Sequence, residues 1–382
     1  MLQNVQPAMG AETVDVLDSG ARVLAQAVIA DRDYPPFARS ARDGFAIRSQ
    51  DAPGVLRLIG EVRAGEVYPD SLCAGEAVEI MTGAPMPEGA DAVVMLEHVL
   101  RDGEKVSVDR EVTAGENFGP LGSEATMGSP ILAPGRRIGF ADVAAMAMVG
   151  LSQVSVFRKP RVAILPTGDE LVQVEESPEA FQIRNSNAWS LAVQVRRAGG
   201  EPSLLGIARD NYESTRSLVE KGLEADLLVL SGGVSAGKYD IVEQVLGDLG
   251  ATFFFDRVKI QPGQPLVFGA VGEKRFFGLP GNPASTMVTF EIFARAALER
   301  LGGVLEPALP MMRARLAKPF RHKTGLTRFL PACLNGDGSV VEPLSWQGSG
   351  DVPAIARANA FLVAEEGREA WAAGDDIQVL LK

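Results

Sequence analysis

The stretch LLVLSGGVSAGKYD at residues 227–240 decides the fold class of this chain. An apolar, strand-like run is followed there by a glycine-rich turn and then by a helix-like run. The stretch FFGLPGNPAST at residues 276–286 repeats the arrangement. Glycines at such a junction let backbone N–H groups approach a ligand, and the start of the helix favours an anion. Two such turns in one α/β segment predict a crevice at the carboxyl ends of parallel strands, suited to a phosphorylated ligand.

Strands and helices alternate on both sides of these two turns. We expect strands within 161–171 and at 204–210, 227–233, 251–258, 265–271 and 276–279, and helices at 187–200, 211–225, 240–250 and 284–301. Such alternation implies a three-layer α/β domain with a parallel or mostly parallel sheet.

The flanking segments have a different character. Residues 1–30 carry apolar side chains at helix-like spacing, which predicts a mostly helical segment. Residues 31–123 are rich in glycine, proline and short alternating runs, which is typical of a β-rich module. Residues 124–157 contain a short helix that ends in glycine, and residues 304–382 return to short strands and turns. The sequence therefore predicts an α/β multidomain protein.

The composition narrows the class of protein. The chain has 382 residues, 46% of them hydrophobic and 23% charged, which is ordinary for a globular protein of two or three domains. It carries no apolar run of about 18 residues and no secretory pattern at its start, so we expect a cytoplasmic protein without a membrane partner. The net charge of −12 and the lack of a basic cluster argue against a nucleic-acid partner.

The sequence has few soft metal ligands. Cys73 and Cys333 are the only cysteines, His98 and His322 are the only histidines, and there is no CxxC or HExxH pattern. This argues against a zinc or iron–sulfur site and against a disulfide framework. A metal in this protein should be a hard cation held by oxygen atoms, which indicates Mg²⁺.

Carboxylates follow several of the expected strands. Asp169 and Glu170 follow the first strand, Asp210 follows the second, and Asp240 begins the helix after the first glycine turn. Any one of them alone is explained as a helix N-cap or a solvated turn residue. Together they could hold Mg²⁺ against a phosphate or position water for attack on phosphorus.

The first glycine turn is similar to two well-known motifs but lacks a residue that each of them requires. Residues 232–239 nearly match a phosphate-binding loop, but Tyr239 stands where a serine or threonine would hold Mg²⁺. They also match the GxSxG nucleophile elbow, but both histidines of the chain lie outside the α/β segment. A purely structural turn is the stronger alternative. Asp43 in ARDGFAIRS and Thr82 in MTGAPMPEGAD are likewise explained by turn chemistry when the residues alone are considered.

Taken together, these segments resemble the molybdopterin molybdenumtransferase family, of the MoeA and gephyrin E-domain type. The matching stretches follow the family's order over almost the whole chain: GARVLAQAV (20–28), YPPFARSARDGFAIR (34–48), EIMTGAPMPEGADAVVMLEHV (79–99), RVAILPTGDEL (161–171), SNAWSL (186–191), LSGGVSAGKYD (230–240), QPGQPLVFG (261–269), GLPGNPAST (278–286) and QGSG (347–350).

The resemblance implies an elongated homodimer with four domains in each subunit. Its α/β domain binds adenylylated molybdopterin, facing the β-rich domain of the other subunit. The implied domains are a discontinuous helical and dimerisation domain at 1–26 and 124–157, an inserted β-rich domain at 27–123, a three-layer α/β, molybdopterin-binding-like domain at 158–303, and a C-terminal β-barrel-like domain at 304–382.

The resemblance also implies an activity: the family inserts molybdate into adenylylated molybdopterin and releases AMP, with Mg²⁺. The catalytic positions carried over are Asp43, Thr82, Glu170, Asp210 and Asp240, with Asp43, Glu170 and Asp240 as metal ligands. The ligand-binding positions are Ser231, Gly232, Gly233, Val234, Ser235, Gln261, Gln264, Pro280, Gly281, Asn282, Ser285 and Ser349. Candidate protein partners are the molybdopterin adenylyltransferase and the recipient molybdoenzymes.

The chain departs from the family pattern at several positions. The family's KPGKP segment carries Gln261 and Gln264 here, so two expected cations are missing. Arg42 replaces the residue before Asp43, Glu124 stands where the family has aspartate, and the segment GLTRF lacks its first arginine. These losses favour an alternative, a paralogue that binds molybdopterin or a partner protein without turnover. A pterin adenylyltransferase is the third alternative, but that enzyme does not need the flanking domains.

Overall fold

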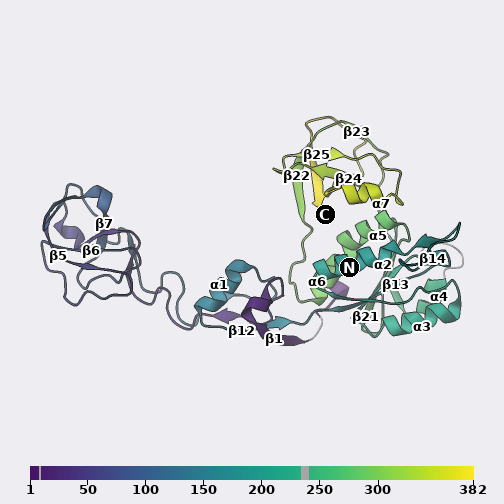
Figure 1. Cartoon of the computed structure of the whole chain (residues 1–382), viewed down its shortest axis with the longest axis horizontal. Coiled ribbons are helices and arrows are strands. Elements are labelled where there is room, and N and C mark those ends of the chain that lie inside the picture. Colours follow the sequence, from purple (N-terminus) through teal and green to yellow (C-terminus); the bar gives the residue numbers. More distant parts are fainter. Residues whose placement is uncertain (8–9, 234–240) are drawn as a thin grey trace. The chain divides into compact units, whose positions relative to one another are not determined.

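The computed structural model describes residues 1–7, 10–233 and 241–382. The chain divides into two compact units (Figure 1). The first unit comprises Met1–Ala25, Gly135–Gly139 and Val154–Lys382, and the second comprises Gln26–Pro134 and Phe140–Gln153. Within the described residues, no helix is long and apolar enough to cross a membrane.

A six-stranded sheet forms the centre of the first unit. Its strands, in spatial order, are β16 (Glu201–Leu204), β13 (Arg161–Pro166), β17 (Leu227–Ser231), β21 (Lys274–Leu279), β20 (Pro265–Val271) and β18 (Thr252–Arg257). The first four strands pair in parallel, and the last two are antiparallel. This confirms the mostly parallel sheet. It also places β17 directly beside β21, so the two glycine turns that follow these strands are neighbours.

Helices cover both faces of this sheet. They are α2 (Ser186–Arg197), α3 (Tyr212–Gly222), α4 (Ile241–Asp248), and a continuous run of α5 (Pro283–Thr289), the π-helix η5 (Phe290–Ala294) and α6 (Arg295–Leu301). Alternate residues of β13 point to opposite faces. Val162 and Ile164 pack in the core with α2 and α6, whereas Ala163 and Leu165 pack in the core with α3 and α4. The three predicted layers are confirmed.

The strand expected at residues 204–210 is wrong in position. β16 ends at Leu204, and the chain beyond it makes only an isolated bridge from Ala208 to Thr167. Pro202 lies inside β16, where a proline would not be expected. The strand tolerates it because β16 is at the edge of the sheet, where a missing N–H group removes no ladder hydrogen bond.

The mostly helical segment expected at residues 1–30 is also wrong. The described part contains the short 3₁₀ turns η1 (Leu2–Asn4) and η2 (Val16–Ser19) and the strands β1 (Ala11–Asp15) and β2 (Val28–Ile29). β1 pairs with β12 (Gln153–Phe157), a partner that is remote in sequence. The Asp15 side chain accepts a hydrogen bond from the Leu17 N–H group at 2.9 Å and so ends the strand in a 3₁₀ turn. The spacing of apolar residues in this segment favours a helix, but the pairing of β1 with the remote strand β12 determines its structure.

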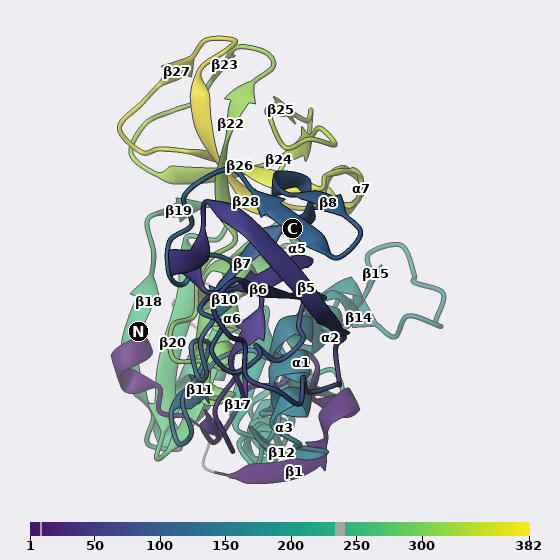
Figure 2. The same cartoon turned by 90° about the vertical axis from the view of Figure 1, so that its left-hand side faces the viewer.

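The C-terminal segment of the first unit closes into a small barrel. Its strands are β22 (Met311–Leu316), β24 (Thr327–Leu334), β25 (Val340–Pro343), β26 (Ala360–Ala364) and β28 (Asp376–Leu381). β26 pairs with both β24 and β28, which completes the ring. The pair β23 (Phe320–Arg321) and β27 (Ala370–Trp371) and the helix α7 (Val352–Arg357) lie beside it (Figure 2). The predicted β-barrel-like domain is confirmed.

The second unit is built on another six-stranded sheet. In spatial order its strands are β7 (Ala92–Met95), β4 (Gly44–Ile47), β6 (Glu76–Ile80), β5 (Gly54–Val62), β9 (Lys105–Val108) and β8 (Leu100–Asp102). The shorter elements are β3 (Arg39–Ser40), η3 (Ser49–Asp51), η4 (Leu96–His98), β10 (Phe118–Gly119), β11 (Pro130–Leu132) and the helix α1 (Phe140–Met148). This β-rich character matches the prediction for residues 31–123, while the exact domain limits stay a prediction.

Candidate ligand cleft

A cleft with a volume of about 450 Å³ opens at the carboxyl ends of β13, β17 and β21. It lies wholly within the first unit. The lining consists of Pro166, Thr167, Gly168, Glu170, Leu171, Ile183, Arg184, Asn185, Ser186, Asn187, Asp210, Ser231, Gly232, Gly233, Pro265, Pro280, Gly281, Asn282 and Pro283. Ile183 and Arg184 form the short strand β15 (Ile183–Arg184), which pairs with β14 (Leu171–Val172) at the rim.

The two glycine turns meet at the floor of this cleft. The Gly232 N–H group donates to the Leu279 carbonyl at 3.1 Å. Gly232 and Gly233 have φ angles of +95° and +64°, which L-residues with a side chain rarely adopt. A Cβ atom on Gly232 would lie only 2.8 Å from the Thr167 carbonyl oxygen, and one on Gly281 would lie 3.4 Å from the Gly232 Cα atom. Glycine is therefore required at position 232, where the first turn packs against Thr167.

Asn187 ties the two turns together. Its Nδ2 atom donates to the Ser231 hydroxyl at 2.9 Å and to the Gly281 carbonyl at 2.7 Å. Asn185, two residues earlier, is buried and caps α2 by accepting a hydrogen bond from the Ala188 N–H group at 3.2 Å. Sequence reasoning did not single out either asparagine as a site residue. The only signal was their place in the stretch that begins the helix, where asparagine is a common cap.

Two polar atoms at the cleft lack partners within the described residues. They are the Thr167 Oγ1 atom, on a side chain that is only 5% exposed, and the Asn187 Oδ1 atom. A buried polar atom left without a hydrogen bond costs about 1–3 kcal/mol. A ligand that presents N–H or O–H groups to these two atoms would recover that cost. The pair therefore indicates a polar ligand rather than an apolar one.

Two carboxylates line the cleft, and a third joins the two loops on which they lie. Glu170 and Asp210 are exposed and line the cleft. Asp169 instead accepts a hydrogen bond from the Asp210 N–H group at 3.1 Å, and Arg209 donates to the Asp169 carbonyl at 3.1 Å. The structure thus brings together two of the acids predicted from the strand ends. Asp240, Val234 and Ser235 lie outside the described residues.

The described residues contain no group of three or more His, Cys, Asp or Glu side chains close enough to hold a metal alone. Asp43 belongs to the second unit and Glu170 to the first. Glu170 and Asp210 nevertheless supply the hard oxygen atoms that Mg²⁺ prefers, and Mg²⁺ is usually bound by one or two carboxylates with phosphate and water oxygens. The residues present fit this mode of binding.

The remaining predicted ligand residues do not line the cleft. Ser285 is buried, and the Ser349 carbonyl accepts from the N–H group of Ala284 at 2.9 Å. Gln261 and Gln264 are exposed, in the segment that leads from β19 (Ile260–Gln261) into β20. These residues gather instead where the α/β domain joins the barrel.

Arg328, the arginine of the segment GLTRF, is a cation at this junction that was not among the predicted site residues. It lies opposite Gln261 in the pairing of β19 with β24. Its Nε atom is buried and lacks a hydrogen-bond partner among the described residues. Only the strand register reveals this proximity, because the two residues are far apart in sequence.

Asp43 and Thr82 form a pair in the second unit. The Asp43 Oδ1 atom accepts hydrogen bonds from the Thr82 N–H group at 2.6 Å and from the Thr82 hydroxyl at 2.8 Å. These bonds, the backbone bond first, hold the pKa of Asp43 below its ordinary value. Both side chains are exposed, so the carboxylate is ionised and accessible.

We expect Thr82→Val to raise the pKa of Asp43 part of the way toward its ordinary value, because the hydroxyl bond is lost and the backbone bond remains. Because the folded pKa is the lower one, this pair contributes stability at neutral pH, and the contribution is lost as the pH falls through the folded pKa. Titration of the Asp43 carboxyl carbon by NMR measures the shift. Thr82→Ser is the control and should keep the lowered pKa. An unchanged pKa in the valine variant would contradict the assignment.

The fold and the cleft define a class of protein: a multidomain α/β protein with a polar cleft at the carboxyl ends of its parallel strands. Comparison with family models makes this specific. Residues 1–150 match the MoeA N-terminal region (domain I and II), residues 163–300 match a "Probable molybdopterin binding domain", and residues 313–382 match the MoeA C-terminal region (domain IV).

The chain belongs to the MoeA family. It is 33% identical over 388 residues to a molybdopterin molybdenumtransferase of Staphylococcus aureus, covering 99% of this chain and 93% of the relative. It is also 33% identical over 378 residues to one from Staphylococcus epidermidis, covering 96% and 90%. A crystal structure of the molybdopterin biosynthesis MoeA protein from Pyrococcus horikoshii OT3 is similar at a TM-score of 0.83 and 30% identity, covering 100% of this chain and 97% of that one. The family and the fold class inferred from the sequence are confirmed.

Proposed function

We propose that this chain inserts molybdate into adenylylated molybdopterin and releases AMP, as a step of molybdenum cofactor biosynthesis in the cytoplasm. The observation that carries the proposal is the joining of two glycine turns, with Glu170 and Asp210 at their rim, in one cleft. This cleft lies within the segment that matches the molybdopterin-binding family model. The relatives from Staphylococcus, which match 99% and 96% of this chain, are named molybdopterin molybdenumtransferases.

The residues of the cleft suit this chemistry. Backbone N–H groups of the second glycine turn, at the start of α5, can bind phosphate oxygens. Thr167 and Asn187 offer polar atoms to N–H or O–H groups of the ligand. Glu170 and Asp210, with the predicted ligands Asp43 and Asp240, would hold Mg²⁺, which when bound neutralises phosphate charge. The same carboxylates can orient a water molecule toward phosphorus and accept its proton.

A second candidate function is favoured by one observation. Gln261 and Gln264 stand where the family has lysines, so the chain lacks two cations at the junction of the α/β domain and the barrel. This favours a paralogue that binds molybdopterin, or a partner protein, without turnover. Complementation of an insertase-deficient cell, scored by the activity of a molybdenum enzyme, separates the candidates. Only the insertase restores that activity.

We expect the double substitution Gln261→Lys and Gln264→Lys to raise molybdate-dependent turnover. A charge-assisted hydrogen bond is about twice as strong as a neutral one, and one donor to a transition state is worth on the order of a hundredfold in rate. Arg328 is the neighbour of Gln261 on the adjacent strand and carries a charge of its own, so we expect the gain to be smaller than the full effect of two donors. The initial rate of AMP release is the measurement.

The matched control for this pair is Gln153→Lys with Gln378→Lys, which adds the same charge at exposed positions elsewhere. No gain in the Gln261 and Gln264 variant, with a fast parent enzyme, would show that the missing charge is already replaced. No activity in either protein would favour the binding paralogue.

The proposal includes a homodimer, in which the Asp43–Thr82 pair of one subunit would face the cleft of the other. One chain has a mass of 40.5 kDa, so the protein should sediment with twice that mass at micromolar concentration. Sedimentation equilibrium measures this directly. A monomer at that concentration would remove Asp43 and Thr82 from the proposed site.

A further inference from the structure

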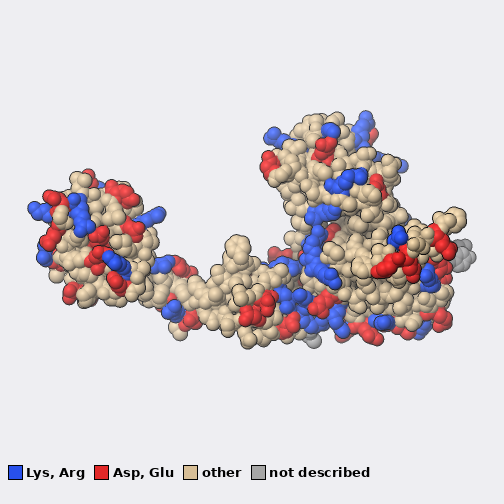
Figure 3. Space-filling model, viewed as in Figure 1, with Lys and Arg blue, Asp and Glu red and all other residues tan. Residues whose placement is uncertain are grey.

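A second cavity of the first unit is lined by cations. Its volume is about 120 Å³, and it shares no lining residue with the ligand cleft. The cationic lining residues are Arg22, Arg137, Arg158, Lys159, Arg196 and Arg197, and Glu299 is the one carboxylate among the lining residues described. Figure 3 shows Lys and Arg side chains gathered on this part of the first unit, near the place where Figure 1 labels α6.

The cavity lies at the opposite end of α2 from the cleft. Asn187 stands in the first turn of this 12-residue helix, and Arg196 and Arg197 stand in its last turn. At 1.5 Å per residue the two ends are about 15–18 Å apart. The cavity is therefore a separate place on the molecule and not an extension of the cleft.

Three of the arginines are held in place by contacts around the cavity. The Arg22 Nη2 atom donates to the Phe157 carbonyl at 2.9 Å. The Arg158 guanidinium donates to both carboxylate oxygens of Asp226, at 2.7 and 2.9 Å. Arginine has five N–H donors, so each keeps others free. The cavity therefore presents fixed donors that need no reordering when an anion binds.

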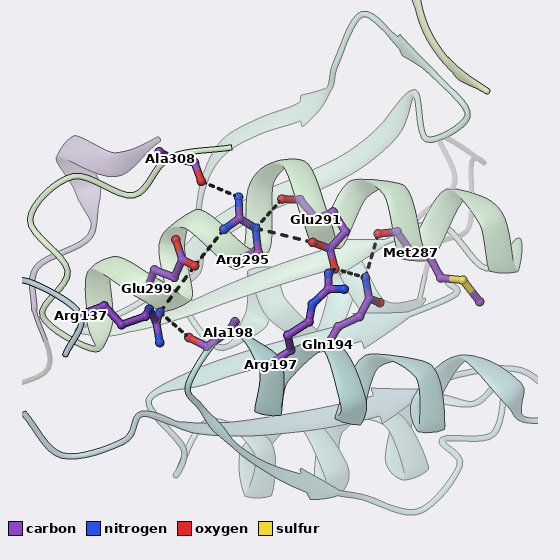
Figure 4. A network of polar contacts seen from close by, with 9 residues as sticks. All are labelled: Arg137, Gln194, Arg197, Ala198, Met287, Glu291, Arg295, Glu299 and Ala308. Atoms are coloured by element: carbon purple, nitrogen blue, oxygen red, sulfur yellow. Dashed lines mark hydrogen bonds and ion pairs between the residues drawn. The ribbon is translucent and has the colours of Figure 1, made fainter. Parts of the chain in front are cut away.

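Arg137 is the third of these fixed arginines. Its guanidinium donates to the Ala21 carbonyl at 3.0 Å and to the Ala198 carbonyl at the end of α2 at 3.3 Å. Figure 4 shows Arg137 between Ala198 and Glu299, with Arg197 turned to Glu291. The position of Arg137 is explained as a cap of α2, because the guanidinium group donates to a carbonyl at the C-terminal end of this helix.

Helix capping does not explain Lys159 and Arg196. Both side chains are exposed, and neither makes a hydrogen bond or an ion pair with any part of the chain that the structure describes. The other four cations each have a carboxylate, supplied by Glu12, Asp226, Glu299 and Glu291. The cavity thus carries an excess of two positive charges.

We propose that this cavity binds one tetrahedral oxyanion, of the size and charge of inorganic phosphate or molybdate. Arginine N–H groups and a lysine ammonium group are the donors that bind such oxygens best. The cavity has a volume of about 120 Å³, so it is larger than the space that one water molecule needs. This leaves room for a small oxyanion. The inference rests on no part of the proposed function.

Calorimetric titration of the full chain with phosphate, and separately with molybdate, at constant ionic strength tests the proposal. We expect Lys159→Ala with Arg196→Ala to weaken the affinity by on the order of tenfold or more, because two charged donors are lost. The stability of this variant without anion should be unchanged, since both side chains are exposed. Arg313→Ala with Lys323→Ala is the matched control, which removes the same charge from exposed positions of the barrel.

The outcomes distinguish phosphate from molybdate as the ligand, and the cavity from the cleft as the binding site. Tight binding of one anion and not the other identifies the physiological ligand class. Gly232→Ala, which alters the cleft, should leave this binding intact. The proposal is overturned if neither anion binds at millimolar concentration. It is equally overturned if the Lys159 and Arg196 variant binds as tightly as the parent protein.

Discussion

Glu170→Gln should lower molybdate-dependent release of AMP by on the order of a hundredfold or more, while the affinity for the adenylylated pterin stays within about threefold. Glu170 is exposed and lines the cleft, and its side chain makes no hydrogen bond to any described residue. The substitution therefore leaves the fold intact. It removes a negative charge that the proposal needs for Mg²⁺ and for proton transfer, whereas the glycine turns that hold the ligand are untouched.

Single-turnover AMP release and equilibrium binding of the pterin, measured on the same protein, separate these two effects. Glu273→Gln is the matched control, because Glu273 is an exposed glutamate of the same domain whose side chain also makes no hydrogen bond to any described residue. It should behave as the parent protein does in both assays. Full activity of Glu170→Gln would exclude this carboxylate from the mechanism.

Gly232→Ala should abolish ligand binding in the cleft, with an affinity loss on the order of a hundredfold. Gly232 has a φ angle of +95°, and the new Cβ atom would lie 2.8 Å from the Thr167 carbonyl oxygen. Backbone cannot yield as a flexible side chain does, so the turn must move away from its neighbour. That movement displaces Gly232 from its hydrogen bond to the Leu279 carbonyl and distorts the turn on which the proposed anion binding depends.

Gly250→Ala controls for the backbone conformation alone. Gly250 also has a positive φ angle, +78°, but nothing lies within 4 Å of its expected Cβ atom. The Gly250→Ala substitution should lower the free energy of unfolding by about 1 kcal/mol, because of similar backbone strain, and should leave ligand binding unchanged. Equal binding by the two alanine variants and the parent protein would show that the conformation of the first glycine turn is not what holds the ligand.

Much of the cleft could be predicted because its elements are local in sequence. Each glycine turn sits between a strand and a helix that follow one another directly, so the pattern of residues 227–240 and 276–286 already implied two ligand turns at one sheet edge. That they touch depends on β17 pairing with β21, and the rule that ligands bind at the carboxyl ends of parallel strands anticipates this. Glu170 and Asp210 were found for the same reason.

Features set by long-range pairing could not be predicted. The strand β1 at Ala11–Asp15 exists because it pairs with β12, and nothing local announces that partner. Arg328 becomes a neighbour of Gln261 only through the register of β19 with β24. Asn187 looks like one of several polar residues at the start of a helix until its two hydrogen bonds, to Ser231 and Gly281, are seen.

The most direct test of the account is the release of AMP from adenylylated molybdopterin by the purified chain, with Mg²⁺, in the presence and absence of molybdate. Chromatography quantifies AMP, and the metal content of the pterin product is measured in the same samples. We expect AMP release that depends on molybdate and matches the molybdenum gained by the pterin. Tight binding of the adenylylated pterin without molybdate-dependent AMP release would contradict it and would establish the chain as a binding protein.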